Sequence, residues 1–266
     1  MLSQLPRLLG LHIIGCPKVD HVAVLRLVSY TPLLESLSLT TTVRNSLYLQ
    51  SSTFLTISIV QETPRPLVLP APPLHRLRNL AFDTRYTLNP SLSPAVLTSI
   101  LFHLRPSSPP LTSFIIKLSN RQILVGHAFI QQLLDAYAHT LRKFAFVDCM
   151  VEIDSIAAIC KECVHLERLE VAFPIKEIVS SYLLPYPMLY DLLLKQKVLQ
   201  PKFTAAMSQS LSLRTLINMG DSHVSNEPRL SLTQESVRYI MDNVHNLRNI
   251  VSDKRIWTVC LLSSIA

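Results

Sequence analysis

A leucine-rich pattern that recurs along the chain is the feature that most limits how this sequence can fold. Segment 8–16 reads Leu-x-x-Leu-x-Ile-x-x-Cys, which fits the repeat template L-x-x-L-x-L-x-x-N/C when Ile is taken as equivalent to Leu. Seven further segments start the same pattern, so chance is a poor explanation even in a leucine-rich chain. They begin at Leu34, Leu77, Leu111, Leu141, Leu166, Leu213 and Leu247.

The template has a direct physical meaning. Its L-x-L pair places two apolar side chains on one face of a short strand, because successive side chains of a strand point to opposite faces. The first Leu turns the chain into the strand and is buried beneath it, and the last position closes the turn that leaves the strand. One repeat cannot bury its apolar side, so repeats stack into a parallel sheet over a shared core.

Most gaps between these strands carry a helical pattern of apolar residues. We therefore expect an α/β leucine-rich-repeat solenoid, a horseshoe with a parallel sheet on its concave face and helices on its convex face. A single domain of about 8–10 irregular repeats would cover residues 1–258, since the long gaps 41–74 and 172–213 each have room for one more repeat. The apolar tail 259–266 has no role that the sequence reveals. The expected helices cover 19–29, 95–104 after Ser93 and Pro94, 127–139, 154–163, 202–210 and 233–244.

Composition narrows the setting in which the protein acts. The net charge of +7 is compatible with an acidic partner without requiring one. The five cysteines are odd in number and scattered, which favours reduced thiols in the cytoplasm or nucleus over a disulfide framework. No apolar run reaches the length of about 18 residues that a membrane span needs, and the N-terminus lacks the basic start of a signal peptide. We expect a soluble protein without a membrane partner.

One short motif resembles part of a metal site. Cys160-Lys-Glu-Cys163 is followed by His165, but a structural zinc site needs four nitrogen or sulfur ligands, and no second pair completes the set. The repeat explains the cysteines better, because Cys163 precedes a predicted strand, while Cys16 and Cys149 follow one. We expect neither a metal nor any other cofactor.

Patterns of catalytic sites are missing from the sequence. Asp221, Ser222 and His223 are contiguous, whereas a catalytic triad is assembled from residues far apart in the chain. No nucleophile elbow, Walker loop or dinucleotide-binding turn occurs, and the chain has only 4 glycines. Basic residues are spread out, without the dense stripe and interleaved aromatics of a nucleic-acid binder. We therefore expect a non-catalytic protein, with nucleic acid as a less favoured kind of partner.

The repeat also predicts where a partner would bind. Side chains between the two core positions of each strand point away from the core, toward the concave face. They mix apolar and charged types, which suits a protein partner better than a phosphate backbone. The alternative, that some of them only fill a tightly curved sheet, stays open. The candidate partner-binding residues are His12, Ser38, Ala81, Ile115, Ala145, Glu170, Ile217 and Val251, with Lys117, Lys143 and Arg168 beside them.

The cysteine-type repeats resemble those of F-box/leucine-rich-repeat proteins, within the ribonuclease-inhibitor-like superfamily. Segments 213–216, 218–223, 231–233 and 253–257 are similar to F-box-type proteins of mushroom-forming fungi. The resemblance covers nearly the whole chain. It implies the substrate receptor of an SCF-type ubiquitin ligase, in which an N-terminal F-box docks a Skp-type adaptor and the repeats present a target to a separate enzyme.

This chain departs from that family in one respect. It carries no F-box and starts inside a repeat strand at Leu8, so a Skp-type adaptor is expected as a partner only if an F-box lies upstream of Met1. The expected function is the substrate-recognition part of the ligase receptor, with a protein target on the concave face. One alternative is a repeat scaffold or inhibitor unconnected to ubiquitin. Another, less favoured, is a nucleic-acid binder.

Overall fold

The computed structural model describes residues 5, 7–14, 16, 24, 27–28, 30–41, 74–84, 93–105, 108–118, 124–174, 202–220 and 231–258. The strands are β1 (Gly10–Ile13), β2 (Ser36–Thr41), β3 (Asn79–Thr84), β4 (Ser113–Leu118), β5 (Leu124–Val125), β6 (Lys143–Val147), β7 (Met150–Val151), β8 (Arg168–Val171), β9 (Thr215–Asn218), β10 (Asn249–Ser252) and β11 (Arg255–Thr258). The helices are α2 (Ser93–Leu104), α3 (His127–Tyr137), α4 (Ile153–Glu162), α7 (Lys202–Met207) and α8 (Gln234–Asn243).

The described part of the chain is a mixed α/β protein with a mostly parallel sheet. Nine strands form this sheet in the order β1-β2-β3-β4-β6-β8-β9-β10-β11, which is also their order along the chain. All pairs are parallel except the last, β10 with β11. The strands β5 and β7 pair separately as a small parallel sheet, which the sequence pattern did not predict.

All eight predicted strands are present, and their central apolar residues align in one row across the sheet. This alignment is strongly favoured, because a shift of the register by one residue would turn every buried side chain of a strand to the other face. The Leu that starts each motif is buried as well from the second repeat onward, with Leu34, Leu141 and Leu213 fully covered. The aligned central row is Leu11, Leu37, Leu80, Phe114, Phe144, Leu169, Leu216 and Ile250.

A single hydrophobic core runs beneath this row. Leu11 at the first strand is partly buried and packs against it, while its equivalents from β2 to β10 are buried. In the middle of the sheet the core becomes aromatic, because Phe144 packs against Phe114 (ring centroids 5.8 Å apart) and against Phe146 (4.7 Å). One continuous core of this kind is what stacked repeats require.

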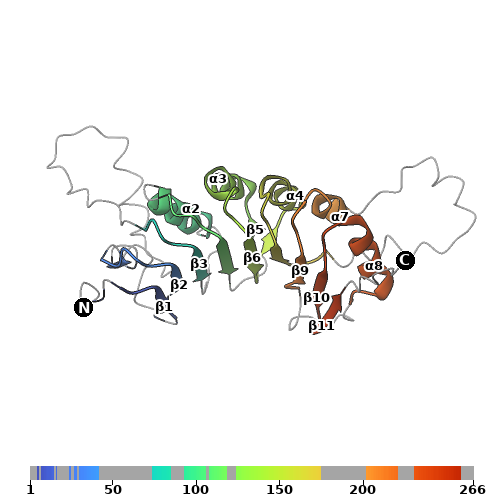
Figure 1. Cartoon of the computed structure of the whole chain (residues 1–266), viewed down its shortest axis with the longest axis horizontal. Helices are drawn as coiled ribbons and strands as arrows, with labels where there is room; N and C mark the ends of the chain where they lie inside the picture. Colours follow the sequence, from blue (N-terminus) through green and yellow to red (C-terminus); the bar gives the residue numbers. More distant parts are fainter. Residues whose placement is uncertain are drawn as a thin grey trace, which may run out of the picture.

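The helices lie on the side of the sheet that carries this core. In Figure 1 the strands follow an arc, and α2, α3, α4 and α7 lie along its outer side. Each helix turns an apolar stripe to the sheet, as Ile130, Leu133 and Leu134 of α3 do. The sequence placed these helices correctly to within a few residues, although α2 already begins at Ser93. Of the helix expected at 19–29, the described residues 24, 27 and 28 are helical.

The backbone just before each strand of the large sheet, from β2 to β10, makes the same hydrogen bonds to the neighbouring repeat. Two successive backbone N–H groups donate to one carbonyl of the preceding repeat, as those of Arg142 and Lys143 donate to Thr112 (2.8 and 2.9 Å). The residue just before each strand therefore sits at an equivalent place in every repeat. We call these residues the entrance row: Leu9, Glu35, Arg78, Thr112, Arg142, Glu167, Arg214 and Arg248.

A hairpin ends the parallel sheet. The turn from β10 to β11 has only Asp253 and Lys254 between the strands, with positive φ angles of 49° and 63°. Such a turn matches the twist of the two strands but normally uses Gly or Asn, so Asp253 and Lys254 did not predict it. The Ser252 hydroxyl bonds to the Asp253 carboxylate (3.1 Å) and holds the turn.

Three sequence-based expectations lie outside the described residues. They are the possible additional repeats in the gaps 41–74 and 172–213, which are described only at their edges, and the tail 259–266. No helix among the residues that the structure describes has the length and apolar character needed to cross a membrane.

Candidate functional site

The face of the sheet opposite the helices, which we call the open face, carries the predicted partner-binding residues. Figure 1 places the strands on the inner side of the arc, with the described helices beyond them. Strand register brings the predicted residues into one row, although they come from eight separate segments of the chain. The row runs His12, Ser38, Ala81, Ile115, Ala145, Glu170, Ile217 and Val251.

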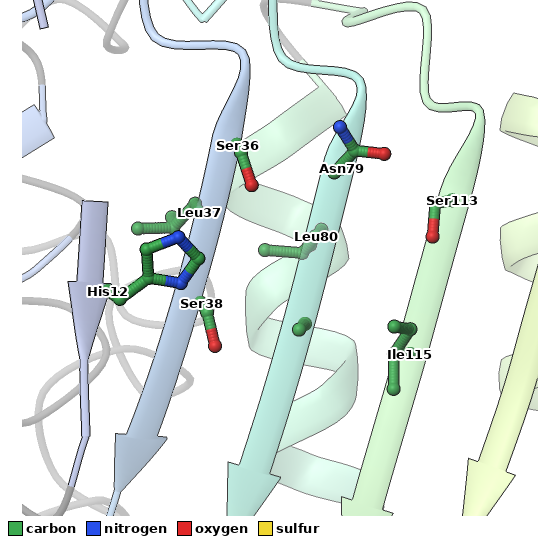
Figure 2. A pocket seen from close by; sticks show the side chains of 9 residues that line it. His12, Ser36, Leu37, Ser38, Asn79, Leu80, Ser113 and Ile115 are labelled. Atoms are coloured by element: carbon green, nitrogen blue, oxygen red, sulfur yellow. The ribbon is translucent and has the colours of Figure 1, made fainter. Parts of the chain in front are cut away.

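Over β1 to β4 the open face is lined by short side chains. A depression of about 270 Å³ lies there, between His12 at one end and Ile115 at the other. Figure 2 shows the His12 ring extending from β1 toward β2, while Ser38 rises from β2. Because Ser and Ala end close to the backbone, they leave room for a side chain of a partner to enter.

Sequence reasoning missed a second row that lines the same depression. Ser36, Asn79 and Ser113 are register partners of one another and sit two positions before the predicted row. A strand alternates its faces with a period of two, so these residues share the open face with Ser38, Ala81 and Ile115. The signal was available, since it is the second x of each L-x-x-L motif.

Over β6 and β8 the open face changes to a charged cluster. Glu170 Oε1 accepts from Lys143 Nζ at 2.9 Å and from Arg168 Nε at 2.7 Å. The Glu170 side chain is 10% exposed, whereas those of Lys143 and Arg168 are 31% and 46% exposed. Both cations therefore keep part of their surface and spare N–H donors available to a partner.

A weaker ion pair lies on two strands of the depression, two positions further along β3 and β4. Lys117 Nζ is 4.0 Å from Asp83 Oδ2, and the Thr40 hydroxyl donates to the same oxygen at 3.5 Å. Register places these three side chains in a further row of the open face, beyond the predicted one. Lys117 was predicted as a candidate, and Asp83 was not.

Two of the predicted binding residues offer little surface. Ala145 is fully buried, and Glu170 is 8% exposed as a whole residue. Ala145 is covered because its methyl group is short and the neighbouring strands carry the longer Ile115 and Glu170. Burial therefore favours the alternative left open above for Ala145, which fills space in the sheet, and Glu170 positions Lys143 and Arg168.

Cys149, Cys160 and Cys163 are core residues. Burial raises the pKa of the Cys149 and Cys163 thiols to about 12, and it raises the pKa of Cys160 as well. These thiols are protonated at neutral pH, which makes them poor nucleophiles and poor metal ligands. His165 is exposed while Cys160 and Cys163 are buried, so the motif does not present three ligands to one point. Among the described residues, no group of three His, Cys, Asp or Glu could hold a metal ion.

The side chains of Ser155 and His127 are as close to each other as a nucleophile and its general base in a hydrolase. His127 Nδ1 lies 3.0 Å from Ser155 Oγ, across the starts of α3 and α4. Ser155 is fully buried, however, so a substrate could not reach its hydroxyl. The contact ties two helices together, and catalysis at this place would need the third group and the open cavity of a hydrolase site.

Comparison with known proteins adds no assignment. No family model matches the chain. No curated protein sequence matches it either.

Proposed function

We propose that this chain is a non-catalytic leucine-rich-repeat solenoid whose open face binds a protein partner. The main support is the row of open-face residues, which strand register aligns across eight strands. Only Ala145 and Glu170 of this row are buried. The face combines a depression between short side chains with a preorganised pair of cations. Protein interfaces have this mixture of apolar, polar and charged contacts.

The finer part of the proposal is that the partner is a target of ubiquitin transfer. It rests on the likeness of the cysteine-type repeats to F-box/leucine-rich-repeat proteins, and the buried positions of Cys149 and Cys163 support it. The chain would then act as the substrate-recognition part of an SCF-type receptor in the cytoplasm or nucleus. A Skp-type adaptor would bind only if an F-box lies upstream of Met1, and a scaffold or inhibitor without ubiquitin is the alternative.

The test of partner binding uses bulky substitutions that leave the core alone. Ala81→Trp fills the depression, and we expect it to abolish capture of the proteins that the unaltered chain retains from an extract. Gln132→Trp is the matched control, because Gln132 is exposed on α3 at the outer side of the arc. Equal capture by both variants and the unaltered chain would contradict the proposal. A separate test asks whether the captured protein is ubiquitylated in cells only while this chain is present.

A further inference from the structure

A second hollow, lined mainly by polar side chains, lies away from the open-face row, along the edge where the strands begin. Its volume is about 380 Å³, and its lining includes four consecutive members of the entrance row. They are Arg142, Glu167, Arg214 and Arg248, so three arginines share the hollow with one carboxylate. We call this hollow the entrance pocket.

The four residues are far apart in the sequence, and the fold stacks them on neighbouring strands. Each precedes a strand at an equivalent position, and neighbouring parallel strands lie about 4.8 Å apart. Arg214 N–H donates to Glu167 O (2.9 Å), and Arg248 N–H donates to Arg214 O (2.8 Å). The side chains of Arg214 and Arg248 therefore extend from adjacent backbone positions on the same edge of the sheet.

Only one of the three arginines has an anionic partner among the described residues. Arg142 Nη1 bonds to Glu167 Oε1 at 3.0 Å. Arg214 and Arg248 are exposed and form no ion pair within that part of the chain. Like charges side by side on neighbouring strands repel each other, so this pair works against stability unless an anion lies between them.

The walls of the pocket are fixed before any ligand arrives. The Ser212 hydroxyl donates to Leu166 O (2.9 Å), and the Asn246 amide donates to Leu211 O. Both bonds connect one repeat to the next, so the two turns that flank the arginines are held in place. A preorganised site loses less entropy on binding than a flexible one.

We propose that the entrance pocket binds an acidic segment of a protein partner through two neighbouring carboxylates. Three guanidinium groups against the Glu167 carboxylate leave two positive charges, which two carboxylates would neutralise. Guanidinium and carboxylate groups match each other in planar, two-point hydrogen bonds. A nucleic acid fits less well, because the Glu167 carboxylate lies between Arg142 and Arg214 in the entrance row and would repel a phosphate, and the lining of the pocket has no Phe, Tyr or Trp for base stacking.

The test measures binding of a fluorescent peptide, Gly-Ser-Glu-Asp-Glu-Ser-Gly, to the full chain by anisotropy. We expect saturable binding below about 1 mM that weakens as salt rises, and none for the same peptide with Gln and Asn in place of the acids. Arg214→Gln and Arg248→Gln should each weaken binding about fivefold, while Arg214→Lys loses less, because it keeps the charge.

Arg78→Gln is the matched control, because Arg78 is an exposed arginine of the same entrance row outside the pocket. It should leave the affinity within about twofold. Arg214→Gln should not lower the melting temperature, which separates lost binding from lost folding. The proposal would be overturned if peptide binding did not saturate at about 1 mM, or if Arg78→Gln lost as much peptide affinity as Arg214→Gln. It would also be overturned if a single-stranded oligonucleotide bound more tightly than the peptide. Ala81→Trp should leave peptide binding unchanged, so this test is separate from that of the open face.

Discussion

The open face over β1 to β4 and the open face over β6 and β8 share one backbone register but differ in chemistry. The first is lined by short side chains such as Ser38 and Ala81, which leave a depression. The second carries long cations anchored on Glu170. In a repeated sheet the backbone supplies equivalent positions, and the side chains at those positions decide whether a region accepts a partner's side chain or orients a partner's charge.

Both regions depend on the same core, so the largest expected effect comes from removing its centre. Phe144→Ala should lower the free energy of unfolding by about 3–5 kcal/mol, since Phe144 is fully buried and contacts two other rings. Urea unfolding followed by circular dichroism measures this. Ile256→Ala, at a side chain that is 70% exposed, should cost less than about 0.5 kcal/mol. A similar loss from both variants would contradict the single core.

Alkaline pH should act on the region around β6 and α4, where the buried thiols lie. The folded protein keeps Cys149 and Cys163 protonated up to about pH 12, whereas the unfolded chain releases these protons near pH 9. The unfolded state therefore binds fewer protons between these values, and stability falls as pH rises. Each thiol should cost about 1.4 kcal/mol per pH unit in that window. Cys163→Ala should reduce this slope, and an unchanged slope would contradict the assignment.

The Glu170 cluster and the Asp83–Lys117 ion pair allow a direct comparison of two parts of the open face. Glu170→Gln removes a nearly buried carboxylate and leaves Lys143 and Arg168 as adjacent cations, so we expect a loss of about 1–3 kcal/mol. Asp83→Asn breaks only the looser contact with Lys117 and should cost less than about 1 kcal/mol. Thermal or urea unfolding of the two variants, measured side by side, gives the difference.

An apolar replacement sharpens the same comparison. Replacing Lys143, Arg168 and Glu170 together by Met, Met and Leu should recover most of the stability that Glu170→Gln loses, because an apolar group then fills the nearly buried site of Glu170 and no cation is left without its partner. Partner capture by this triple variant should nevertheless be weaker than capture by the unaltered chain, because both cations are gone. Capture equal to that of the unaltered chain would show that the cluster serves the fold alone.

Thiol labelling gives the smallest and most local expected effect. Iodoacetamide at neutral pH should leave Cys149, Cys160 and Cys163 unmodified in the folded protein, because all three are buried and their pKa values are raised. Cys16 is only partly buried and should react. Peptide mapping by mass spectrometry measures each site, and rapid modification of Cys160 would contradict the assignment of α4 to the core.

The strands could be predicted from the sequence because each must bury the same apolar positions. From β2 to β10 every central residue of the motif, from Leu37 to Ile250, is buried. The strands β5, β7 and β11 escaped prediction for a physical reason. Two of them have only two residues, and β11 follows a turn of Asp253 and Lys254 without glycine, so neither periodicity nor turn chemistry indicated them.

The candidate site was predictable only in part. Alternation along each strand identified the open-face row, but it could not tell that Ala145 would be covered by its neighbours or that Glu170 would turn inward to two cations. The entrance pocket was missed because Arg142, Arg214 and Arg248 are far apart in the sequence. Their common position, the first x of each L-x-x-L motif, is the signal that would have identified them.

The central claim is that the open face, and not the helical side, contacts the partner. A photo-crosslinking amino acid placed singly at Ser38, at Ile217 or at Gln132 tests this in one experiment. We predict that the same partner is crosslinked from positions 38 and 217, which face the open side of the sheet, and not from position 132 on α3. Crosslinking from position 132 alone would contradict the account.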